Sequence, residues 1–163
     1  MCGGIEMKIT IDMPWERNLT VNHCRMGPIG NWHLKPHVEG WMDRLGWEVF
    51  AAWSELGRPE LLPTAKDPLY VVLDCRFANK AERDAENYFY VVANAVAAGL
   101  RLDNDQHVRT RAGEVVVDRE NPGFTITITD EEGADDLLEP GGADPAHGGG
   151  DDLPEHVGTY PLR

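Results

Sequence analysis

Apolar and polar residues alternate along residues 7–13, and this two-residue period is typical of a half-buried strand. After a loop rich in turn formers, the spacing changes at Pro36 to three and four residues, which predicts a helix over residues 36–56. Pro36 suits its first turn, and Gly57 with Pro59 ends it. The face that we expect to be buried consists of Val38, Trp41, Met42, Leu45, Val49, Trp53 and Leu56.

The same two periods recur in the second half of the chain. Ala95 and Gly99 leave one side of a second helix small, so that another helix can approach it closely. The order β-α-β-α-β-β predicts an α+β (mixed α/β) domain with a mixed sheet. The elements after the first helix are expected as a strand at 69–77, the second helix at 85–98, an extended region at 108–117 and a strand at 124–129.

The negative charge of the chain is concentrated at its end. The 163 residues carry a formal charge of −13, which taken alone argues against a nucleic-acid partner. Residues 130–163 hold ten carboxylates against Arg163 alone, and they are rich in glycine and proline. We therefore predict a folded domain over residues 1–129 with a charge of −4, followed by a disordered acidic tail over residues 130–163.

Cysteines and hydropathy indicate the compartment. The three cysteines show no CxxC spacing, so neither a disulfide framework nor a zinc knuckle is predicted. His33 and His37 are separated by the helix-starting Pro36, and we do not expect them to pair on a metal. No apolar run of about 18 residues and no secretory signal is visible. The chain is therefore expected to be cytoplasmic, with no membrane partner.

Two pairs of carboxylates flank the second helix. Asp84 and Glu86 lie at the junction from the preceding strand into this helix, and Asp103 and Asp105 lie in the turn after it. Clustered carboxylates are what Mg²⁺ requires, and a bound Mg²⁺ can activate water for phosphodiester hydrolysis. A structural role is the alternative for both pairs. Asp84 would make a good N-cap with Asn87 as its partner, and Asp103-Asn104 is ordinary turn chemistry.

The first motif, Asp84-Ala-Glu86-Asn87, and the later Gly99-Leu-Arg-Leu-Asp103-Asn-Asp105-Gln106 resemble the RusA family of Holliday junction resolvases. In that family an Asp-x-Asp-Asn opens a helix and an Asp-Asp-x-Gln turn follows it. The stretch with Pro14-Trp15 and Asn18-Leu-Thr-Val-Asn22-His23-x-Arg25 is similar to the family's proline, asparagine-rich loop and basic residue. The resemblance covers residues of about 7–129.

The resemblance implies a homodimeric, Mg²⁺-dependent endonuclease that makes paired nicks in four-way DNA junctions. Asp84 and Glu86 match the acids of the first motif, with glutamate in place of the usual aspartate. In the second motif Asp103 takes the first position and Asn104 the catalytic one, and Asp105 would substitute if the turn shifts. The family's lysine one helical turn beyond the second acid is here Tyr90. The candidates for its missing charge are Lys80 and Arg83.

The expected contacts with DNA come from the asparagine-rich loop and from basic residues near the acidic motifs. The second helix, about 15 residues and roughly 22 Å long, separates the two acidic pairs. An antiparallel homodimer that pairs this helix with its twin would bring one pair to the other across the interface. The candidate DNA contacts are Asn18, Asn22, Arg25, Arg76, Lys80 and Arg83, with Arg17, Arg101, Arg109 and Arg111 as further cations.

Three functions follow from this sequence. The leading hypothesis is a Mg²⁺-dependent, structure-selective endonuclease that resolves Holliday junctions or related branched DNA in recombination and repair. The second is a RusA-like protein that binds branched DNA but has lost cleavage through the changes at Glu86 and Tyr90. The third is an adaptor whose acidic tail binds a basic protein. In the first two cases we expect the tail to compete weakly with DNA for the basic surface.

Overall fold

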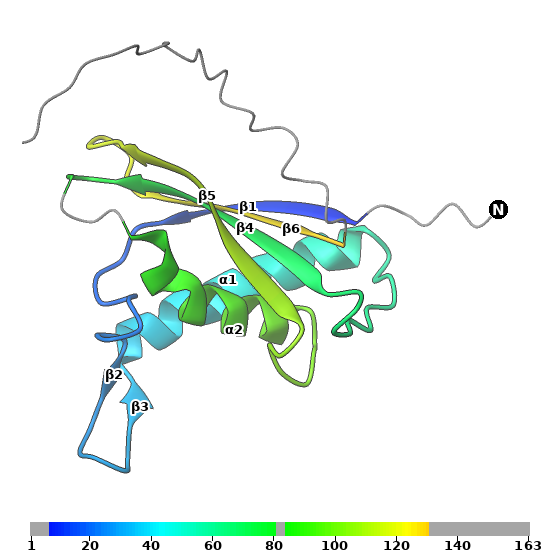
Figure 1. Ribbon diagram of the computed structural model, residues 1–163, viewed down its shortest axis with the longest axis horizontal. Helices are drawn as coiled ribbons and strands as arrows, with labels where there is room; N and C mark the ends of the chain where they lie inside the picture. The colour runs from blue at the N-terminus through cyan, green and yellow to red at the C-terminus, as the bar shows by residue number, and fades with distance from the viewer. Residues whose placement is uncertain (1–6, 81–83, 131–163) are drawn as a thin grey trace, which may run out of the picture.

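The computed structural model describes residues 7–80 and 84–130, which form a four-stranded sheet with two helices packed on one face (Figure 1). The strand order is β1-β6-β4-β5, and the predicted mixed α+β fold is confirmed. Apart from Asp130, the predicted tail lies outside the described residues. The main elements are β1 (Lys8–Pro14), α1 (Pro36–Glu55), β4 (Leu69–Phe77), the 3₁₀ helix η1 (Ala85–Tyr88), α2 (Phe89–Gly99), β5 (Val108–Val117) and β6 (Gly123–Thr129).

Strand alternation divides the sheet into a buried and an open face. β6 lies between β1 and β4 and is antiparallel to both, whereas β4 and β5 are parallel and are connected through η1 and α2. In the β1–β6 register Ile9 faces Ile128 and Ile11 faces Ile126, and all four side chains are buried. The predicted face of α1 covers them, except that Leu56 follows the last helical residue and is exposed. Its four fully or nearly fully buried residues are Val38, Trp41, Leu45 and Val49.

Two cysteines belong to this core. Cys24 and Cys75 are free and buried. Burial raises the pKa of Cys75 to about 12, with a smaller contribution from the neighbouring carboxylate of Asp74. Burial also raises the pKa of Cys24. Both thiols are therefore protonated near neutral pH and unsuited to nucleophilic chemistry.

The second helix starts later than its pattern predicts. Residues 85–88 form the 3₁₀ helix η1, and the α-helix begins only at Phe89. The carbonyl of Asn87 accepts a hydrogen bond from the N–H of Val21 at 2.8 Å. That carbonyl is directed to a loop far away in sequence, which is a tertiary contact that a local pattern cannot reveal.

The small face of α2 packs against α1 of the same chain. A Cβ on Gly99 would lie 2.5 Å from the carbonyl oxygen of Gly46 and 2.8 Å from Cβ of Val49. Ala95 lies on the same side, where its carbonyl faces Gly46. The expected close approach of a helix is therefore present, but its partner is α1. This face is not available to a twin α2 in a second copy.

Gly99→Ala is expected to destabilise the protein by roughly 2–3 kcal/mol, because the added methyl must push the two helices apart. Thermal or urea unfolding measures this change. Gly40→Ala is the matched control, since a Cβ there meets nothing within 4 Å and alanine favours the helix. Equal stability of the Gly99 variant and the wild type would contradict the packing described here.

Candidate functional site

Asp84 caps η1, as its sequence context predicts. One carboxylate oxygen, Oδ1, accepts from the N–H of Glu86 at 3.2 Å, and Oδ2 accepts from Nδ2 of Asn87 at 3.0 Å. Asp84 and Glu86 are both exposed, directly after the β4–η1 connection. Each oxygen of Asp84 has one donor, which leaves acceptor capacity toward solvent. The cap orders Asp84 and does not prevent it from binding a cation.

The asparagine-rich loop is packed against η1. Leu19 and Cys24 are fully buried, and the bond from Val21 to Asn87 attaches this loop to the capped turn. Nδ2 of Asn18 lies 3.3 Å from Nε2 of His37 at the start of α1, whereas the side chain of Asn22 is exposed. The loop and the first acidic pair therefore form one structural unit.

Arg25 contacts Tyr90, the residue that stands where the sequence resemblance would place a lysine. Its Nη2 donates a hydrogen bond to the hydroxyl of Tyr90, and its guanidinium carbon lies 4.6 Å from the centroid of that ring. Tyr90 is four residues beyond Glu86, about one helical turn. Lys80 is exposed in the β4–η1 connection, and Arg83 lies outside the described residues. The sequence suggests Lys80 and Arg83 for this charge, whereas in the structure Arg25 contacts Tyr90.

The second acidic pair lies in the turn that follows α2. Oδ1 of Asn104 accepts from the N–H of Gln106 at 2.9 Å, which is the predicted turn chemistry. The carbonyl of Asp105 accepts from the N–H of Val108 at 2.9 Å and so begins β5. Asp103 is exposed and Asp105 half-buried.

Within a single chain the two acidic pairs lie far from each other. η1 follows the C-terminal end of β4, whereas Asp105 precedes the N-terminal end of β5, which runs parallel to β4. With η1 and α2 between them, the two pairs are separated by roughly 24 Å. Within residues 7–80 and 84–130, no group of three or more His, Cys, Asp or Glu side chains is placed to hold a metal ion.

Arg76 is placed on the open face of the sheet, opposite the helices. Its neighbours Cys75 and Phe77 are buried on the helix side, so alternation directs Arg76 outward. Nη1 donates to Oγ1 of Thr125 at 2.7 Å and lies 3.8 Å from Oδ1 of Asp12. Nε donates to the carbonyl of Asn121 at 3.2 Å. The structure thus groups Arg76 with the β5–β6 turn and β1, away from Asp84.

The other cations of the sequence prediction are also placed by local contacts. The guanidinium of Arg101 lies 5.0 Å from the ring centroid of Phe50, and that of Arg111 lies 4.7 Å from the ring of Tyr70. Nη2 of Arg109 donates to the carbonyl of Ala65 at 3.2 Å. Among the candidate cations of the described residues, Lys80 lies in the connection that leads to Asp84, and Arg25 contacts the first turn of α2.

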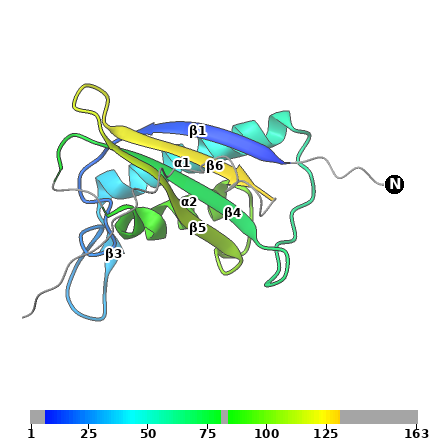
Figure 2. The ribbon, with the colours of Figure 1, turned by 45° about the horizontal axis from the view of Figure 1, so that its top comes forward.

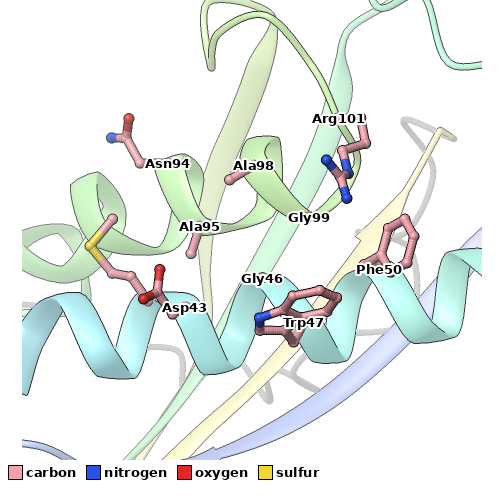
Figure 3. Close-up of a pocket in the computed structure, with 10 residues that line it drawn as sticks. Asp43, Gly46, Trp47, Phe50, Asn94, Ala95, Ala98, Gly99 and Arg101 are labelled. Carbon is pink, nitrogen blue, oxygen red and sulfur yellow. The ribbon is translucent and has the colours of Figure 1, made fainter.

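A groove of about 270 Å³ lies between α1 and α2 on the side away from the sheet (Figure 3). Trp47 and Phe50 on α1 and Asn94 and Arg101 from the α2 side line it. Asp43 is the single carboxylate among the residues that line it. Neither predicted acidic pair contributes to this groove, so it is separate from the candidate site.

The predicted loop contains a short hairpin that the sequence pattern does not indicate. β2 (Arg25–Met26) pairs antiparallel with β3 (His33–Leu34), and the hairpin extends away from the sheet (Figures 1 and 2). Strands of two residues are too short for a detectable period. The glycines at 27 and 30, on either side of Pro28, are the signal from which a tight turn was predictable.

Comparisons with known proteins do not assign this chain to a family. In the described residues, none of the helices has the length and apolar character needed to cross a membrane. No protein-family model matches the chain, and no curated protein matches it.

Proposed function

We propose that this protein is a Mg²⁺-dependent, structure-selective endonuclease of the RusA type that acts on branched DNA. The observation that carries the proposal is the capped, exposed pair Asp84 and Glu86, with the guanidinium of Arg25 held on Tyr90 one helical turn further on. Two carboxylates beside a fixed cation are the groups that phosphodiester hydrolysis uses. The element order and the resemblance of both acidic motifs agree with this proposal.

The donor set of this turn fits Mg²⁺. Asp84 and Glu86 supply hard carboxylate oxygens that are open to water, and Mg²⁺ is commonly bound through one or two carboxylates together with waters and a substrate phosphate. A bound Mg²⁺ would activate water and offset charge on the phosphate. Arg25 then has the role of holding a phosphate oxygen beside the carboxylates, by a charge-assisted hydrogen bond.

A homodimer remains part of the proposal, with β5 as the better surface. β5 is the last strand of the sheet, and its outer edge has no partner strand in the described part of the chain. Val115, Val116 and Val117 are exposed at this edge, and a long apolar edge strand commonly needs a covering partner. η1 packs against β5 as well as β4.

Antiparallel pairing of two β5 strands would join the separated acidic pairs. Along its full length, such pairing places the C-terminal end of one β5, beside η1, against the N-terminal end of the partner's β5. Asp84 and Glu86 of one protomer would then meet Asp103 and Asp105 of the other. Two equivalent composite sites follow from the two-fold symmetry, as paired nicking requires.

The test is a nicking assay on a synthetic four-way junction, with Mg²⁺ and with EDTA, and with a linear duplex of the same sequence as control. We expect Mg²⁺-dependent nicks at the branch and no cleavage of the duplex. Junction binding without nicking would favour a RusA-like protein that binds branched DNA but does not cut it. The observation in favour of that alternative is that Glu86 and Tyr90 differ from the residues of the family pattern. No binding of either DNA would reject both and leave the acidic-tailed adaptor.

Removal of residues 131–163 is expected to raise DNA affinity by roughly threefold to tenfold at low salt, because nine carboxylates are lost with one arginine. The truncation should follow Asp130, whose Oδ1 accepts from the N–H of Met7 at 3.0 Å. Junction binding measured across a salt series checks this, and the difference should shrink as salt rises. Equal affinities at every salt concentration would refute competition by the tail.

A further inference from the structure

The β2–β3 hairpin carries a preformed tip. The N–H of Asn31 donates to the carbonyl of Pro28 at 3.0 Å, and Gly30 between them has a φ of +88°, as in a type II turn. Gly27 has a φ of +117°, and a Cβ there would lie 2.4 Å from the carbonyl oxygen of Asn31. The tip therefore depends on two glycines and has a defined shape.

Large apolar side chains are displayed at this tip. Ile29, at the apex of the turn, is 95% exposed, and Trp32 is 57% exposed. The tip lies roughly 10 Å beyond the paired residues of the hairpin. A structured turn that presents isoleucine and tryptophan to solvent, away from the core, indicates a binding element.

The segment that contains the hairpin has a charge opposite to that of the whole chain. Residues 17–38 contain no aspartate or glutamate, although the chain carries −13. The cations of this stretch are Arg17, Arg25 and Lys35, and three histidines accompany them. A segment free of carboxylates suits a polyanion and repels none of its phosphates.

The base of the hairpin is fixed to the candidate catalytic turn. Arg25, the first residue of β2, contacts Tyr90, and Val21 donates to the carbonyl of Asn87. The N–H of Lys35 donates to the carbonyl of Cys24 at 2.8 Å and closes the base. A ligand bound at the tip is thus held in a set direction from Asp84 and Glu86.

We propose that the hairpin reads the branch point of DNA: Trp32 stacks on an exposed base and Ile29 inserts into the opened step. This inference rests on the proposed function and names the element that selects its substrate. Aromatic stacking platforms within a positive surface bind unpaired bases, and apolar wedges insert at opened base steps. Asn31 at the tip and the cations Arg25 and Lys35 at the base favour nucleic acid over a protein partner. Because the base is attached to the acidic turn, a ligand held at the tip lies in a fixed direction from the candidate catalytic carboxylates.

The experiment compares Trp32→Ala with the wild type in EDTA, so that no DNA is cut. The probes are a four-way junction with 2-aminopurine beside the branch, a 20-nucleotide single strand and a linear duplex. We expect about tenfold weaker binding of the junction and the single strand, loss of the 2-aminopurine fluorescence increase, and unchanged duplex binding. Trp47→Ala is the matched control, since Trp47 is 67% exposed on α1, and it should behave as the wild type.

Each outcome decides the inference. Trp32→Ala binding equal to the wild type, or equal losses for both tryptophan variants, would overturn it even if the wild type nicks junctions. Trp32-dependent binding to anionic phosphatidylserine vesicles, without binding to DNA, would also overturn it and assign the tip to a membrane surface. Trp32-dependent binding of single strands by a protein that never nicks junctions would sustain the inference and reject the proposed nuclease.

Discussion

Asp84→Asn is expected to lower Mg²⁺-dependent nicking of a four-way junction at least a hundredfold while leaving the protein folded. Asparagine is as good an N-cap as aspartate, and its Oδ1 can still accept from the N–H of Glu86. The substitution removes the charge that would hold the cation, and loss of a metal ligand removes most transition-state stabilisation. Initial nicking rates and the unfolding temperature, measured on the same preparation, separate the two roles of Asp84.

Asp118→Asn is the matched control for this substitution. Asp118 also orders a turn, since its Oδ1 accepts from the N–H groups of Glu120 and Asn121 at 3.0 Å each. It lies in the β5–β6 turn and belongs to neither acidic pair. We expect wild-type nicking from this variant. Full activity of Asp84→Asn, or equal loss in both variants, would remove the first acidic pair from the catalytic site.

The sheet and α1 were predictable because their side-chain periods are repeated many times. Ile9 and Ile11 alternate with exposed residues along β1, and Val38 to Val49 returns to one face through three turns of α1. Burial in the core requires apolar residues at regular intervals along these elements. Each further interval is therefore additional evidence for the same strand or helix. The N-cap at Asp84 was also predictable, because its hydrogen bonds span only two and three residues.

The candidate site was predictable only in part, because its assembly depends on contacts between distant segments. Arg25 and Tyr90 are 65 residues apart, and no local sequence pattern at either residue predicts their contact. The bond from Val21 to Asn87 likewise replaces the first turn of the predicted helix by η1. By contrast, the outward direction of Arg76 was implied by its place between Cys75 and Phe77 in one strand.

Mixing two inactive variants tests whether the site is shared between protomers. One variant is Asp84→Asn, and the other carries Asp103→Asn together with Asp105→Asn, so that either residue of the second pair is removed. After co-expression or mild unfolding and reassociation, we expect about a quarter of the wild-type nicking activity, because half of the dimers are mixed and each has one intact composite site. Separately, each variant should be inactive. The measurement is the nicking rate per protomer at equal total protein.

The control is a mixture of Asp84→Asn with Glu86→Gln, two changes in the same acidic pair. In every dimer of this mixture each site lacks one ligand of that pair, whether sites are shared or not, so activity should stay absent. Restoration in the first mixture alone therefore requires that Asp84 and the Asp103–Asp105 turn come from different protomers. An inactive first mixture would reject the shared site, because a shared site leaves one intact copy in every mixed dimer. The two pairs, roughly 24 Å apart in one chain, would then not form one composite site across the interface. Val116→Glu adds an independent check, since a charge on the β5 edge should abolish both dimerisation and the restored activity.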